Sequence, residues 1–160
     1  MLAIAVAVLV VLLPLRVTPA PQVTFVSLKG ESIATGAPGG KVMLVNFWAT
    51  DCAVCVREMP DFVQTYEKYR DRGLEVIAVA MRHDPPNYVI RYAEANRLPF
   101  KVALDTLGEH AKAFGGVRAT PTTFVIDRRG NIAERIVGRP DFGKLNALIE
   151  EKLAEANQRP

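Results

Sequence analysis

The only two cysteines of the 160-residue chain, Cys52 and Cys55, are separated by two residues. Such a pair can form a structural disulfide, supply half of a metal site, or make and break a disulfide in turn. A structural role is disfavoured because the loop that the pair closes is too short to constrain the unfolded chain. No metal site is expected, because zinc prefers four ligands and the two histidines, His83 and His110, lie on separate predicted elements.

The position of the pair favours redox chemistry. A nearly continuous apolar run over residues 42–48 predicts a strand buried on both faces, and a helical pattern follows from about 52 to 72. The first turn of a helix stabilises an anion, so a thiolate at Cys52 would have a lowered pKa and would be a nucleophile. Cys55, one turn later, would point inward and resolve a mixed disulfide.

The remaining elements follow from the same kinds of pattern. Strands are expected over residues 23–28, 32–35, 42–48, 74–81, 100–104, 122–126 and 132–137, and helices over 52–72, 87–96, 109–114 and 141–156. Strands that alternate with helices predict parallel pairing, and the final hairpin adds antiparallel strands. We therefore expect an α/β fold with a central mixed β-sheet, helices on both faces and an N-terminal β-hairpin extension.

The N-terminus carries an apolar run over residues 2–13, which is shorter than the roughly 20 residues of a membrane-spanning helix. Small residues around Ala20 resemble a signal-peptidase site, although no basic residue precedes the run and Pro21 follows the proposed cut. We predict that residues 1–20 are a signal peptide or an N-terminal membrane anchor, and that 21–160 form one domain. Either reading places the protein in the periplasm or another extracytoplasmic compartment. The alternative is that the apolar run forms a buried core helix at the N-terminus.

Two segments that lie far apart in the chain carry a family resemblance. The segments VNFWATDCAVCVREMP and ATPTTFVIDRRG together resemble the thioredoxin superfamily, and more narrowly its TlpA/ResA/CcmG branch of exported thiol–disulfide oxidoreductases. The similarity runs from about Val23 to the C-terminus. It implies a thioredoxin-like domain in which Cys52 and Cys55 form a redox-active disulfide and reduce client proteins without a cofactor.

The resemblance also implies roles for residues outside the pair. Pro121 is expected to be cis and to lie against the cysteines, which would leave the backbone of Thr120 free to pair with an extended substrate segment. The alternative is that Pro121 only begins the strand over 122–126. Trp48 is expected beside the site, where it would pack in the core and help to shape the substrate surface.

Three residues of the site are interpreted as tuning residues. Asp51 stands where the family usually has tryptophan; it can cap the helix, or its charge can oppose the Cys52 thiolate and make the dithiol a better reductant. Asn46 stands where cytoplasmic thioredoxins have aspartate, and an amide cannot accept the proton of Cys55. Glu58, one turn beyond Cys55, is the nearest candidate base; the alternative is a solvated surface glutamate.

The predicted partners follow from the same resemblance. They are client proteins with disulfides, such as apocytochrome c, and a membrane-embedded thiol electron donor. A membrane tether is possible and a monomer is expected. The net charge of +3 is too small to indicate nucleic-acid binding. The alternative functions are a copper(I)-binding protein, since soft thiolates suit that ion, and a redox-inert thioredoxin-like binding domain.

Overall fold

A six-stranded mixed sheet forms the centre of the protein in the computed structural model, which describes residues 18–36 and 38–155. In spatial order the strands are β1 (Thr18–Pro19), β8 (Asn131–Val137), β7 (Thr122–Ile126), β4 (Val42–Trp48), β5 (Leu74–Ala80) and β6 (Lys101–Leu104). Strands β4, β5 and β6 are parallel, whereas β4–β7, β7–β8 and β8–β1 are antiparallel. The predicted mixed sheet is confirmed.

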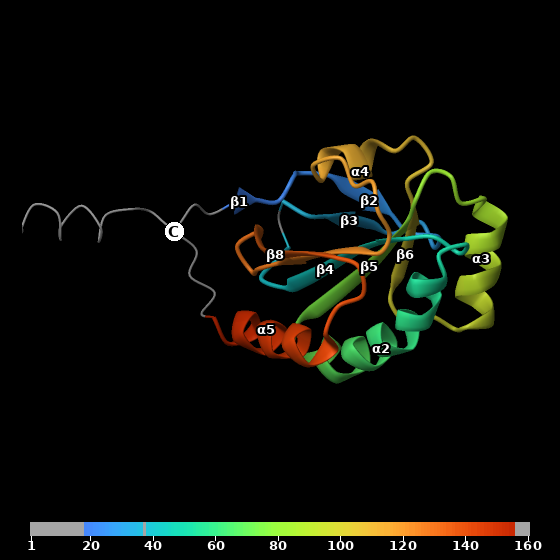
Figure 1. Ribbon diagram of the computed structural model, residues 1–160. Coiled ribbons are helices and arrows are strands. Elements are labelled where there is room, and N and C mark those ends of the chain that lie inside the picture. The colour runs from blue at the N-terminus through green and yellow to red at the C-terminus, as the bar shows by residue number, and fades with distance from the viewer. Residues whose placement is uncertain (1–17, 37, 156–160) are drawn as a thin grey trace, which may run out of the picture.

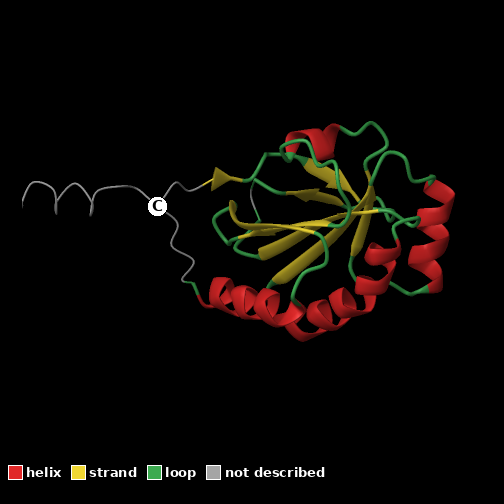
Figure 2. Ribbon diagram, in the orientation of Figure 1, coloured by secondary structure: helices red, strands yellow, loops and turns green. Residues whose placement is uncertain are grey.

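Helices and a hairpin cover the two faces of this sheet (Figures 1 and 2). The other elements are β2 (Thr24–Val26), β3 (Ser32–Ala34), α2 (Ala53–Tyr69), the 3-10 helix η1 (Arg70–Arg72), α3 (Pro86–Ala95), α4 (Glu109–Ala113) and α5 (Phe142–Ala154). Helices α2 and α5 lie along one face, and α4 with the β2–β3 hairpin lies on the other. The hairpin is the predicted N-terminal extension.

Strand β4 shows why other elements must pack against both faces of the sheet. All of its residues are buried, and successive side chains point to opposite faces of the sheet. Leu44 and Trp48 belong to the core shared with α2, α3 and α5, whereas Val45 and Phe47 belong to the core shared with α4 and the hairpin. By the same alternation, Asn46 lies on the α2 face, so its amide is directed toward the helix that carries the cysteines.

The structure differs from the predicted elements mainly near the N-terminus. No strand is predicted before residue 23, but Thr18 and Pro19 pair with Ile132 and Asn131 of β8 and extend the sheet. Two residues are too few to produce a readable strand pattern. The apolar run over 2–13 and most of the predicted signal or anchor segment lie outside the described residues. Within 18–36 and 38–155, no helix has the length and apolar character needed to cross a membrane.

Candidate active site

The two cysteines sit at the N-terminus of α2 and are joined by a disulfide. Cys52 is the N-cap residue, and its Sγ accepts a hydrogen bond from the backbone N–H of Cys55 at 3.2 Å. Cys52 is half-buried, whereas Cys55 is 0% exposed. The spacing predicted this arrangement. A thiolate on Cys52 would keep a backbone donor from the first helical turn, which is the interaction that lowers a thiol pKa.

Asp51 does not cap the helix. Its side chain is 74% exposed, and Oδ1 lies 3.6 Å from Nε2 of His83. The predicted cap is wrong because α2 begins one residue later, and the sulfur of Cys52 takes the acceptor position that a capping carboxylate would occupy. The carboxylate of Asp51 remains next to the nucleophile in sequence, where surrounding water weakens its electrostatic effect.

Glu58 is 0% exposed, so its interpretation as a solvated helix residue is wrong. It lies three residues after Cys55, on the inward stripe of α2 that also contains Met59 and Phe62. Burial raises the pKa of Glu58 to about 7, although a hydrogen bond from Asn46 and the positive charge of Arg139 act in the opposite direction. A carboxyl group with that pKa can accept or release a proton at neutral pH.

Asn46 connects Glu58 to the sheet. Its Nδ2 donates to Oε1 of Glu58 at 3.3 Å and to Oγ1 of Thr123 at 3.0 Å. Both donor protons of the amide are thereby used. Among the described residues, Oε2 of Glu58 and Oδ1 of Asn46 are buried without a hydrogen-bond partner. The carboxyl group is therefore held in place through one oxygen, while the other stays available for a proton.

The segment before β7 lies at the same end of the sheet as the cysteines. Phe47 pairs with Thr122, so the chain that enters β7 passes beside the end of β4 from which the loop to Cys52 departs. The peptide bond between Thr120 and Pro121 is cis. Thr120 is half-buried, and across residues 18–36 and 38–155 no hydrogen bond is found for its N–H or C=O. This backbone can accept an extended segment of another chain.

Trp48 is a core residue. Its side chain is fully buried, and its ring centroid lies 5.2 Å from that of Tyr92. The predicted contribution of Trp48 to a substrate surface is therefore wrong for a direct contact, because a client segment cannot reach the indole. The indole lies on the same face of β4 as Asn46, in the buried cluster that also contains Cys55.

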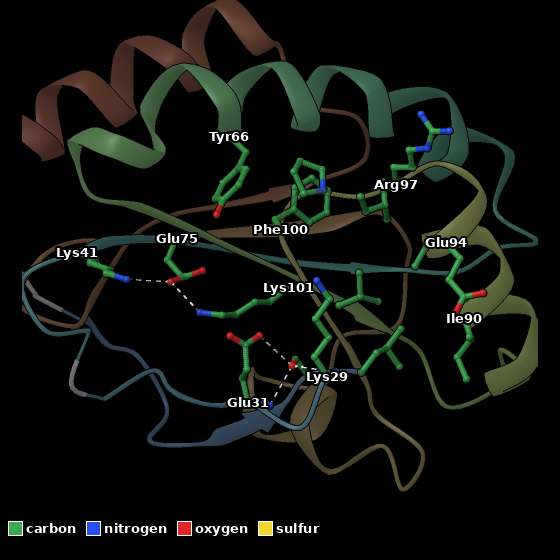
Figure 3. Close-up of a pocket in the computed structure, with 16 residues that line it drawn as sticks. Lys29, Glu31, Lys41, Tyr66, Glu75, Ile90, Glu94, Arg97, Phe100 and Lys101 are labelled. Atoms are coloured by element: carbon green, nitrogen blue, oxygen red, sulfur yellow. Dashed lines mark hydrogen bonds and ion pairs between the residues drawn. The ribbon is translucent and has the colours of Figure 1, made fainter.

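A cavity of about 660 Å³ lies elsewhere, between α2, α3 and the β2–β3 turn (Figure 3). Among the residues that line it, Nζ of Lys41 and Nζ of Lys101 both lie 3.1 Å from Oε2 of Glu75. These residues are at the amino ends of the parallel strands, whereas Cys52 follows the carboxyl end of β4. Ligand sites in open α/β sheets occur at the carboxyl ends, so we treat the Glu75 cluster as structural.

Replacing Glu75 with glutamine is expected to lower stability and to leave disulfide reduction unchanged. The substitution removes a buried charge that two partly exposed lysines share, which should cost about 1–2 kcal/mol of unfolding free energy. Urea unfolding and an insulin reduction assay measure the two effects. Loss of activity in a folded Glu75→Gln protein would contradict the structural assignment.

One buried residue near the cysteines, Asp84, was not singled out from the sequence. In the sequence, Asp84 marks only the end of a predicted strand before Pro85 and Pro86. In the structure, its carboxylate is buried and accepts two hydrogen bonds from Thr50. An acidic residue between a buried strand and a Pro-Pro pair is the only signal that could have drawn attention to it. No local pattern indicates that the partner lies 34 positions earlier in the chain.

Comparisons with known proteins agree with this geometry. A family model described as Redoxin matches residues 17–149, a range that includes both cysteines. Thiol-disulfide oxidoreductase ResA of Bacillus anthracis is 33% identical over 135 residues, covering 82% of this chain and 75% of the relative. ResA of Halalkalibacterium halodurans is 35% identical over 124 residues, covering 78% and 67%. The crystal structure of a thiol:disulfide interchange protein from Chlorobium tepidum has a TM-score of 0.78 at 31% identity, covering 87% of this chain and 98% of that one.

Proposed function

The chain belongs to the Redoxin family and is a thiol–disulfide oxidoreductase, and from this premise we propose that it reduces disulfides in exported client proteins. The observation that carries the proposal is the unequal exposure of the pair. Cys52 reaches solvent at a helix N-terminus, while Cys55 is enclosed beside a buried carboxyl group with a pKa of about 7. This arrangement separates an attacking thiolate from a resolving thiol.

The proposed reaction transfers two electrons in two exchange steps. In the first, the Cys52 thiolate attacks one sulfur of a client disulfide; a bond forms between Cys52 and the client, and the second client sulfur leaves as a thiolate. In the second, Cys55 loses its proton and attacks Sγ of Cys52. The mixed disulfide breaks, the client is released with both sulfurs reduced, and the Cys52–Cys55 disulfide forms.

Glu58 is proposed as the acceptor of the Cys55 proton. The two residues lie one helical turn apart on the buried stripe of α2, and Oε2 of Glu58 has no hydrogen-bond partner among the described residues. Asn46 is proposed to orient the carboxyl group through the hydrogen bond to Oε1. The raised pKa suits a base that must give the proton up again at neutral pH.

Client binding is proposed at Thr120 and Pro121. The unpaired backbone of Thr120 can form hydrogen bonds with an extended client segment, as in recognition by strand addition. Pro121 has no N–H and lies buried immediately before β7, and its carbonyl already accepts a hydrogen bond from the N–H of Gly138 at 2.8 Å. Thr120 is therefore the residue of this pair that can contact the client through both backbone groups.

The direction of the reaction is tested by the redox potential and by activity. We expect a low, thioredoxin-like potential, to which the exposed carboxylate of Asp51 makes a small contribution because it opposes a thiolate on its neighbour Cys52. Equilibration with glutathione, followed by separation of the oxidised and reduced forms, measures the potential, and insulin reduction by dithiothreitol measures turnover. A strongly oxidising potential would reverse the proposed direction. Copper bound to protein purified under reducing conditions, without insulin reduction, would favour the copper(I) alternative.

Replacing Asp51 with asparagine is expected to make the protein slightly more oxidising. The substitution removes one negative charge beside Cys52 and so stabilises the thiolate of the reduced form. Because Asp51 is 74% exposed, screening limits the effect to roughly 15 mV, which corresponds to about a threefold change in the equilibrium constant of a two-electron couple. His83→Asn is the matched control for loss of the contact between Asp51 and His83 alone. An unchanged or lower potential in Asp51→Asn would contradict the proposed tuning.

The cellular setting is proposed from the relatives and from the apolar N-terminus. The relatives named ResA share the cysteine chemistry, and the run over residues 2–13 fits export with either cleavage or anchoring. The domain would then work outside the cytoplasm as a monomer, receive electrons from a membrane-embedded thiol donor, and reduce clients such as apocytochrome c. Membrane fractionation of cells that express the full chain distinguishes an anchored form from a cleaved one.

A further inference from the structure

Asp84 places both carboxylate oxygens on a single residue of the neighbouring loop. Its Oδ2 accepts a hydrogen bond from the backbone N–H of Thr50 at 2.6 Å, and its Oδ1 accepts one from the Thr50 hydroxyl at 2.6 Å. Asp84 is 5% exposed. Burying a carboxylate costs free energy unless it accepts strong hydrogen bonds. Breaking either bond to Thr50 would therefore be unfavourable, so the two bonds fix the position of Thr50.

Thr50 lies in the turn that delivers the nucleophile. The backbone N–H of Cys52 donates to the carbonyl of Ala49 at 3.2 Å, and this bond closes a turn whose central residues are Thr50 and Asp51. Cys52 follows directly as the N-cap of α2. The position of Thr50 in this turn therefore helps to set where Sγ of Cys52 lies relative to the N–H of Cys55, which is its hydrogen-bond donor.

The loop that carries Asp84 is itself held in place. The N–H of Met81 donates to the carbonyl of Trp48 at 2.9 Å, and the N–H of Asp84 donates to the carbonyl of Met81 at 2.9 Å. Pro85 and Pro86 follow and restrict the backbone beyond the carboxylate. Asp84 therefore links the carboxyl end of β5 to the loop that carries Thr50 and Cys52.

We propose that Asp84 is a positioning residue for disulfide exchange, acting through Thr50 to keep Sγ of Cys52 at the N-terminus of α2. It touches neither the client nor a sulfur in this role. The inference rests on the proposed nucleophile, Cys52, and concerns what holds it. Without the Asp84–Thr50 bonds, the Cys52 thiolate spends less time near its backbone donor, so its pKa rises and its reactivity at neutral pH falls.

The decisive comparison is Thr50→Val against Thr50→Ser. Valine removes the hydroxyl donor and keeps the shape, whereas serine keeps the donor. The readout is the rate of Cys52 alkylation by iodoacetamide as a function of pH in the reduced protein. We expect Thr50→Val to react about tenfold more slowly at pH 7, with its thiol titration displaced to higher pH, and Thr50→Ser to stay within about threefold of wild type.

Thr65→Val is the matched control for a buried threonine that loses a hydrogen bond elsewhere. The Thr65 hydroxyl donates to Oδ1 of Asn146 at 3.1 Å, between α2 and α5. This variant should lose stability without any change in the alkylation profile. If Thr50→Val and Thr65→Val shift the unfolding midpoint alike and neither changes the profile, Asp84 and Thr50 are merely structural and the proposal is wrong.

Asp84→Asn separates position from charge. Asparagine can still accept from the Thr50 N–H and can donate to its hydroxyl oxygen, so the contact survives while the charge is lost. We expect Asp84→Asn to react at least as fast as wild type, and Asp84→Ala to lose reactivity as Thr50→Val does. An equal loss in Asp84→Asn and Asp84→Ala would mean that the charge matters and would overturn the positioning role. Normal alkylation with no insulin reduction in the wild type would instead refute the proposed function alone.

Discussion

A Cys55→Ser variant is expected to stop halfway through the reaction and to accumulate with Cys52 covalently joined to its client. Serine cannot attack the mixed disulfide, so the second exchange step is blocked while the first proceeds. Multiple turnover in the insulin assay should fall by at least about a thousandfold. Non-reducing electrophoresis of the variant expressed in its own cell detects the trapped species, and mass spectrometry of the linked peptide identifies the client.

Cys52→Ser is the matched control for trapping. It removes the solvent-accessible sulfur and leaves Cys55 enclosed, so few or no client complexes should form. Recovery of apocytochrome c in the Cys55→Ser complexes would support the proposed client class. The assigned order of attack would be wrong if Cys52→Ser trapped clients as efficiently as Cys55→Ser.

The Glu58→Gln variant is expected to remove a pH dependence from the stability of the oxidised protein. The pKa of Glu58 is raised by burial to about 7 in the folded state, against 4.5 for an ordinary glutamate. Between these values the folded protein binds more protons than the unfolded chain, so wild-type stability falls as pH rises from about 4.5 to 7. The loss should be on the order of 3 kcal/mol, and Glu58→Gln should not show it.

Glutamine is a fair probe at this position because its side-chain oxygen can still accept from Nδ2 of Asn46. Urea unfolding at several pH values between 4.5 and 8 measures the difference in unfolding free energy between the two proteins. The pH-dependent contributions of all other carboxylates cancel in this difference, because both proteins contain them. A flat difference curve would mean that Glu58 is ionised throughout this range, and the argument from burial would fail.

The same variant tests the proposed proton transfer. Glutamine cannot accept the proton of Cys55, so release of the client from the mixed disulfide should slow by roughly tenfold to a hundredfold at pH 7. Alkylation of Cys52 should change little, because Glu58 acts on the second step. Single-turnover kinetics with a labelled disulfide peptide resolve the two steps. An equal slowing of both would point to a general disturbance of the site.

Much of the scaffold follows from local patterns in the chain. The buried strands β4 and β7 have the predicted bounds, because β4 is a short and nearly continuous apolar run and β7 is rich in β-branched residues. Gly73, with a φ of 103°, ends the 3-10 segment after α2, since this backbone conformation favours glycine. The exposed and buried positions of Cys52 and Cys55 follow from helical spacing over a single turn.

The sequence by itself determined the cysteine pair, the elements that flank it and the family to which it belongs. Only the tertiary structure decided that Glu58 is buried, that Asp51 is solvated and that Asp84 holds Thr50. The reason is the separation in sequence between contacting residues: Asn46 donates hydrogen bonds to Glu58, 12 positions away, and to Thr123, 77 positions away. Periodicity tells which side of a helix is apolar, but the fate of a polar group on that side depends on the distant residues packed against it.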